Sequence, residues 1–163
     1  MVLLRGINVG GKNPVPMARL REVLGELGYE AVVTYIASGN VILSSDHMPD
    51  RIKREIEAAL PKAFKLHAEL IAVLVLTAAQ LKAVIADRPK GFGDQPGTYH
   101  SDAIFLMGID ATAAMEAFDR REGVDDLWPG KGVIYSQRLS ARRTKSRLSK
   151  IAVSPHYKAN DDP

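Results

Sequence analysis

Apolar residues along this chain alternate between strand and helix spacing, in an order that predicts a mixed α+β fold. Residues 2–4 form a short apolar run typical of a strand. Apolar residues then recur at helical spacing over residues 17–27. Residues 31–36 and 41–43 are β-branched runs separated by a turn composition, which predicts a hairpin.

A second helix and a fourth strand complete the first half of the predicted pattern. Asp50 is a suitable cap for the helix, and Pro61 is expected to end it. Residues 66–76 are apolar on both faces, as expected of a central strand covered on each side or shared between two sheets. The resulting order of strand, helix, strand, strand, helix, strand is that of a ferredoxin-like α/β sandwich.

The second half shows a similar alternation. Thr77 and Gln80 match a capping box that opens a helix reaching Ile85. A glycine- and proline-rich loop over residues 90–102 precedes a strand at 103–107. Asp110 is expected to cap a further helix, and the runs 124–128 and 133–136 predict a hairpin that pairs Trp128 with Tyr135. We therefore expect two fused ferredoxin-like halves.

This pattern predicts that the chain is divided into three parts. Residues 1–76 are predicted to form an N-terminal ferredoxin-like half, and residues 77–137 a second α/β half packed on it. Residues 138–163 form a basic C-terminal segment, in which a helix is expected over residues 145–153. Asp125 and Asp126 are interpreted as hairpin residues that favour solubility, because adjacent strand positions point to opposite faces.

Composition narrows the classes of function. A chain of 163 residues with 46% hydrophobic and 25% charged residues is typical of a self-sufficient globular protein. It has no cysteine, which excludes disulfides and thiol nucleophiles, and its four histidines are scattered without metal-ligand spacing. We therefore expect no metal and no cofactor. The longest apolar stretch is too short to span a bilayer, so a cytoplasmic protein without membrane contact is the expectation.

Several motifs near the N-terminus carry a family resemblance. Residues 3–13 read LLRGINVGGKN, residues 15–17 read VPM, and residues 35–41 read YIASGNV. With these motifs, the chain resembles DUF1697, a bacterial family of unknown function, from its first residues to the basic segment 146–150. The resemblance implies a ferredoxin-like α+β fold and brings no established activity.

The glycine-rich loop over residues 5–13 is the first candidate site. Such a loop presents backbone amides that suit an anion, and Arg5 and Lys12 add positive charge. The ferredoxin-like order brings this loop, residues 38–40 and residues 62–65 to one edge of the sheet. The predicted ligand is an anionic or nucleotide-like small molecule, bound by Arg5, Asn8, Gly10, Gly11, Lys12 and Asn13 with Ser38 and Asn40 lining the edge.

Two alternatives to this site remain open from the sequence. The glycines and asparagines of the loop are equally suited to shape turns, which would make this a structural or interaction domain without catalysis. A nucleic-acid-associated module is the other alternative, because residues 138–158 hold seven of the 22 basic residues and no acidic residue. Its candidate contacts are Arg142, Arg143, Lys145, Arg147 and Lys150.

Overall fold

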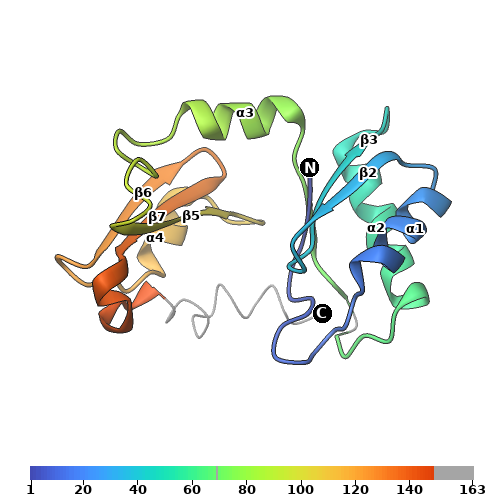
Figure 1. The fold of residues 1–163 in the computed structure, drawn as a ribbon. Coiled ribbons are helices and arrows are strands. Elements are labelled where there is room, and N and C mark those ends of the chain that lie inside the picture. Colours follow the sequence, from blue (N-terminus) through green and yellow to red (C-terminus); the bar gives the residue numbers. More distant parts are fainter. Residues whose placement is uncertain (69, 149–163) are drawn as a thin grey trace. The chain divides into compact units, whose positions relative to one another are not determined.

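The computed structural model describes residues 1–68 and 70–148, and contacts divide this chain into two compact units. The first unit is Met1–Leu81, and the second begins at Lys82. The domain boundaries expected after residues 76 and 137 stay predictions. Each unit is described by itself (Figure 1).

The first unit contains a four-stranded antiparallel sheet with the ferredoxin-like order β2-β3-β1-β4. One helix follows β1 and a second follows β3, so the predicted order of elements is confirmed. The elements are β1 (Val2–Leu4), α1 (Met17–Glu26), β2 (Glu30–Tyr35), β3 (Asn40–Ser44), α2 (Pro49–Ala63) and β4 (Val73–Val75).

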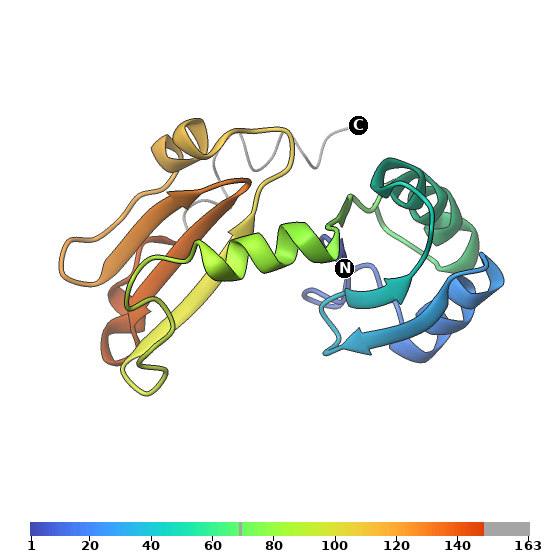
Figure 2. The same cartoon turned by 90° about the horizontal axis from the view of Figure 1, so that it is seen from above.

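Both helices of the first unit cover the same face of this sheet (Figures 1 and 2). The apolar stripe of α1 buries Leu20 and Leu24, and that of α2 buries Ile56 and Leu60. These side chains join the inward-facing strand residues in one core. Thirteen residues form its buried part: Val2, Leu4, Ile7, Val15, Leu20, Leu24, Tyr29, Val41, Ile52, Ile56, Leu60, Ile71 and Val73.

The strand expected over residues 66–76 is much shorter in the structure, which corrects the prediction. Only Val73–Val75 is extended in the sheet, and β4 is an edge strand rather than a central or shared one. The backbone before β4 bonds to the glycine-rich loop instead, since the amides of His67 and Ala68 donate to the side chain of Asn13. The apolar character of this segment reflects burial of Ile71 in the core and not a long strand.

The expected ends of α2 are also corrected. The helix begins at Pro49, whose missing N–H is harmless in the first turn, and Asp50 makes no capping hydrogen bond. Pro61 lies inside the helix, which continues to Ala63. Proline there removes one hydrogen bond near the helix end, and the amide of Phe64 still donates to the carbonyl of Leu60 at 3.0 Å.

The second unit contains a three-stranded antiparallel sheet with the order β5-β7-β6. Its β5–α4–β6–β7 segment repeats the order of β1–α1–β2–β3 in the first sheet. The strand expected at 103–107 begins earlier, at Tyr99. The elements are α3 (Ala78–Ala86), which crosses the division between the units, β5 (Tyr99–Phe105), α4 (Ala111–Glu116), β6 (Asp125–Gly130), β7 (Val133–Leu139) and the 3-10 helix η1 (Ser140–Lys145).

Local signals predicted several features between residues 77 and 135. The Thr77–Gln80 capping box is confirmed by two reciprocal hydrogen bonds of 2.8 and 3.1 Å. Asp110 caps α4 by accepting from the amides of Thr112 and Ala113. Trp128 lies opposite Tyr135 in the β6–β7 ladder, as expected.

The structure describes only the first four residues of the helix expected over residues 145–153, so most of that helix stays a prediction. Residues 140–145 form a 3-10 helix, and Ser146 has extended backbone that ends it. Residues 149–153 lie outside the described residues. Leu148, the last described residue, is buried in the core of this unit.

Candidate functional site

The glycine-rich loop folds into a small hairpin between β1 and α1 (Figure 1). Val9 and Lys12 form an antiparallel bridge, and the Lys12 amide donates to the Val9 carbonyl at 2.9 Å. Gly10 and Gly11 are the two central residues, with φ of 57° and 76°. Two consecutive positive φ values define a type I′ turn, which glycine adopts without steric cost. The glycines therefore form an exposed hairpin tip, and α1 begins only at Met17.

Asn8 fixes the base of this hairpin. Its side-chain nitrogen donates to the carbonyls of Val15, at 2.9 Å, and Ala37, at 2.8 Å. Its side-chain oxygen accepts from the amide of Val15 at 2.8 Å. The side chain thus joins the loop to the β2–β3 turn, and its hydrogen-bonding capacity is used within the protein.

Asn13 makes a second set of connections. Its side-chain nitrogen donates to the carbonyl of Gly6 at 3.1 Å, and its oxygen accepts from the amides of His67 and Ala68 at 2.8 and 3.1 Å. Asn13 is buried, with 9% of its surface exposed. Residues 5–13 and 36–40 and the backbone of residues 67–68 therefore meet at one edge of the first sheet. We call this surface, with the preceding residues 62–66 included, the loop edge.

The β2–β3 turn packs closely against the loop. The Leu4 amide donates to the Gly39 carbonyl at 2.9 Å. A Cβ atom at Gly39 would lie 2.7 Å from Leu4 Cβ and 2.9 Å from Ile7 Cδ1, so only glycine fits. Ser38 and Asn40 contact each other, because the Asn40 side-chain nitrogen donates to Ser38 Oγ at 2.8 Å.

The loop edge carries positive charge. Its three segments contain no aspartate or glutamate and four lysine or arginine residues: Arg5, Lys12, Lys62 and Lys65. The three lysines are exposed, while Arg5 is half-buried and interacts with neighbouring groups. Glu69 follows the third segment directly in the sequence. The four positive side chains within the segments favour an anionic partner.

The basic segment of the second unit is partly neutralised by its own unit. Arg147 lies 3.5 Å from Asp119, and Arg138 lies 3.4 Å from Asp102. Arg142, Arg143 and Lys145 are exposed in η1. Lys150 lies outside the described residues.

Asp125, the first residue of β6, is a buried carboxylate and not a solubility residue of the hairpin, which corrects its interpretation from the sequence. Asp125 is only 3% exposed and accepts from the amides of Arg121, at 2.9 Å, and Arg147, at 3.0 Å. Burial opposes its ionisation, but hydrogen bonds from Ser146, Arg147 and Arg121 together lower its pKa. Asp125 therefore fastens residues 146–148 to β6, a role that adjacent aspartates in the sequence did not signal.

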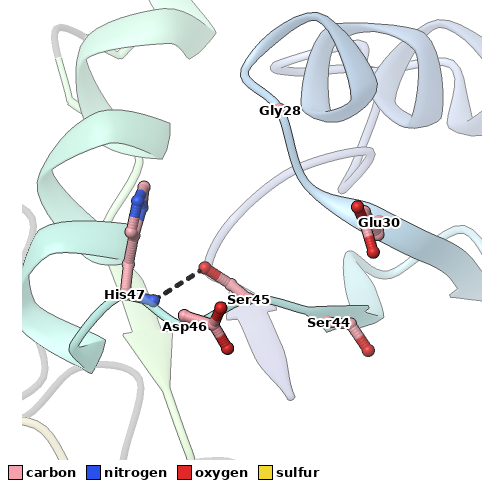
Figure 3. A pocket seen from close by; sticks show the side chains of 6 residues that line it. All are labelled: Gly28, Glu30, Ser44, Ser45, Asp46 and His47. Atoms are coloured by element: carbon pink, nitrogen blue, oxygen red, sulfur yellow. Dashed lines mark hydrogen bonds between the residues drawn. The ribbon is translucent and has the colours of Figure 1, made fainter.

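The opposite edge of the first sheet holds a pocket of about 240 Å³ that the sequence did not indicate. Its lining includes Glu30, Asp46 and His47, but these side chains do not converge on one point (Figure 3). The His47 amide donates to Ser45 Oγ at 3.0 Å. The pocket is built on a turn and on the start of α2.

A charged cluster lies behind His47. Glu55 accepts from the Tyr29 hydroxyl at 2.5 Å and from Arg51 Nε at 2.7 Å, and His47 Nδ1 lies 3.5 Å from it. These hydrogen bonds, that of Tyr29 first, lower the pKa of Glu55 to about 2. Burial and the bond to Glu55 raise the pKa of Tyr29. The cluster ties the end of α1 to α2.

The described residues were also compared with the requirements of a metal site and of a membrane-spanning helix. No group of three or more His, Cys, Asp or Glu side chains within residues 1–68 and 70–148 is arranged to hold a metal ion. Every helix of the described chain is too short or too polar to cross a lipid bilayer. The cytoplasmic location stays a prediction.

The fold and the loop edge define a small α+β protein with a ferredoxin-like sheet and a glycine-rich hairpin after its first strand. The chain belongs to the protein family of unknown function DUF1697, whose model matches residues 1–135. It is similar to a solved structure described as the conserved bacterial protein SP0830 from Streptococcus pneumoniae. The two share 26% identity over 96% of this chain and 87% of the other, with a TM-score of 0.74. No curated protein matches the sequence.

Proposed function

We propose that the loop edge binds an anionic small molecule. The observation that carries the proposal is the meeting of three segments at the base of the hairpin, held together by the side chains of Asn8 and Asn13. Within these segments there are four lysine or arginine residues and no aspartate or glutamate. A site built in advance loses little conformational entropy when a ligand binds. Asn8 and Asn13 position the loop in this proposal and do not contact the ligand.

The ligand contacts come from the tip itself. Gly10 and Gly11 occupy the turn positions, so their amides lie outside the Val9–Lys12 hydrogen bond. Successive amides in a turn form a concave anion-binding surface. Lys12 is exposed beside them and supplies a charge, and Ser38 and Asn40 line the neighbouring turn. A phosphate or carboxylate group matches these donors.

A thermal-shift titration with inorganic phosphate and pyrophosphate tests the proposal, since a ligand selective for the folded state raises the melting temperature. The Lys12→Ala variant should bind about tenfold more weakly, because a hydrogen bond to a charged group is typically worth about 1.5 kcal/mol or more. Lys131→Ala is the matched control, since Lys131 lies between Gly130 and Gly132 in the exposed turn of the other unit.

Wild-type binding retained by the Lys131 variant and weakened in the Lys12 variant would support the loop edge. Absence of any stabilisation by either anion, or equal weakening in both variants, would contradict the proposal. The second result would indicate a nonspecific charge effect.

A second candidate function is nucleic-acid binding through η1, and it is supported by the exposure of Arg142, Arg143 and Lys145 on one short helix. Binding to a phosphate backbone weakens steeply with salt. A triple alanine variant at these positions should lose binding of a short RNA at low salt, measured by fluorescence anisotropy. Unchanged binding in that variant would contradict this candidate.

A further inference from the structure

The face of the first sheet opposite the helices carries apolar side chains of its own. Val2, Leu4 and Val41 point into the core, so the alternating residues Leu3, Asn40 and Ile42 lie on the opposite face. Residues directly opposite in an antiparallel ladder share a face, which adds Val33, opposite Ile42, and Tyr35, opposite Asn40. This surface is called the open face.

The open face is most exposed where it approaches the loop edge. Tyr35 is 70% exposed and Ile36 is 61% exposed, and Val9 of the hairpin is 66% exposed. The carbonyl of Ala37, two residues after Tyr35, accepts the hydrogen bond from Asn8. The end of β2 that carries Tyr35 is therefore joined to the base of the hairpin, on which Lys12 is exposed. The combined surface has an exposed aromatic ring on the strand and a positive charge on the hairpin.

Asn40 lies between these two ends. It is half-buried, faces Tyr35 in the ladder and uses its side-chain nitrogen on Ser38 Oγ. Within the described residues, no group donates a hydrogen bond to its side-chain oxygen, which leaves an acceptor on the face that Asn40 shares with Tyr35. Asparagine in such a place suits the hydrogen-bonding edge of a nucleobase, and tyrosine suits its flat face.

We infer that the ligand of the loop edge is a nucleoside phosphate, with its base stacked on Tyr35 and its phosphate against the Gly10–Lys12 tip. This inference rests on the proposed function, because it assigns the anionic group to the same amides and to Lys12. The charge complementarity of the cationic tip and a phosphate, next to an exposed tyrosine, selects a nucleotide over a purely apolar partner. Asn40 accepts from an exocyclic amine of the base.

Isothermal titration calorimetry of the full chain with adenosine monophosphate, adenosine and inorganic phosphate tests the inference. Adenosine monophosphate should bind at least about tenfold more tightly than phosphate, since base stacking on an aromatic residue is worth on the order of 1–3 kcal/mol. Tyr35→Ser should bring the affinity for adenosine monophosphate down to that for phosphate. Tyr35→Phe should retain it, and Ile85→Ser is the control for loss of an exposed apolar side chain elsewhere.

The outcomes separate the two proposals. Equal binding of adenosine monophosphate and phosphate, or an unchanged affinity in Tyr35→Ser, overturns the inference while the anion site stands. Binding of neither compound overturns both. If the open face instead pairs two copies of the chain, Tyr35→Ser abolishes a dimer in sedimentation experiments and adenosine monophosphate does not bind, which also overturns the inference.

Discussion

Single residues around the first turn are constrained by space as well as by backbone conformation, and Gly39 shows both effects. It has a φ of 84°, and an added Cβ would meet Leu4 and Ile7 within 3 Å. Gly39→Ala should lower the free energy of unfolding by about 2–4 kcal/mol, from overpacking and from the left-handed conformation. Gly28 has a similar φ of 87° but open space around it. Gly28→Ala should cost only about 1 kcal/mol, and equal losses in urea unfolding would contradict this account.

Asn13 provides a second test at this scale. Replacing it with alanine leaves the buried amides of His67 and Ala68 without their acceptor. The expected loss of stability is about 2–3 kcal/mol. Urea unfolding at pH 7 measures this loss. A loss well below about 1 kcal/mol would be inconsistent with the bonds described.

The lowered pKa of Glu55 predicts that the free energy of unfolding depends on pH in the acid range. Its pKa of about 2 in the folded protein lies below its ordinary value of 4.5, so the ionised form favours the folded state. This contribution is fully present above pH 4.5 and is lost as the pH falls toward about 2. Glu55→Gln should therefore flatten the decline in stability over this range in acid unfolding curves. An equally steep decline in the variant would show that other carboxylates cause it.

The sequence offered two accounts of the loop residues because asparagine suits both a ligand and a turn. Motif chemistry located the loop and its glycines correctly. The bonds from Asn13 to residues 54 and 55 positions away depend on tertiary packing, which local patterns do not report. Asp125 was misread for the same reason, since its partners at residues 146–147 come from a segment distant in the sequence.

Helix starts could be predicted from the sequence where the capping residues lie within one turn of each other. The Thr77–Gln80 box and the Asp110 cap each depend on residues within one turn, and both were found. The apolar run over residues 66–76 misled because burial in a core loop and burial in a central strand give the same pattern. The prediction that Pro61 ends α2 was wrong, because a proline near a helix end removes only one hydrogen bond.

The cap of α4 gives a prediction for this scale. Asp110→Ala removes two hydrogen bonds to the amides of Thr112 and Ala113. It should lower the free energy of unfolding by about 1 kcal/mol, and Asp110→Asn should restore most of the loss. Thermal unfolding of the three proteins measures this difference. Equal stability of wild type and Asp110→Ala would show that the helix needs no cap.

At the scale of the whole molecule, the ferredoxin-like order of the first unit followed from the sequence because that order depends only on the succession of elements. The two units differ in their cores: thirteen buried residues form the cluster of the first, and four form that of the second within the described chain. Amides of β1 and β3 should therefore exchange with solvent more slowly than those of β5 and β7, as hydrogen-exchange mass spectrometry measures. Faster exchange in the first sheet would contradict this ranking.

The central claim is that the loop edge is a ligand site and not only a set of turns. Amide-resolved NMR titration of the full chain with inorganic phosphate tests it most directly, because Gly10 and Gly11 in the first unit and Gly130 and Gly132 in the second report separately. The account predicts saturable shifts at Gly10, Gly11 and Lys12, with the glycines of the second unit unaffected. Shifts of equal size at both turns, or none at Gly10 and Gly11, would contradict it and leave the glycines as turn residues alone.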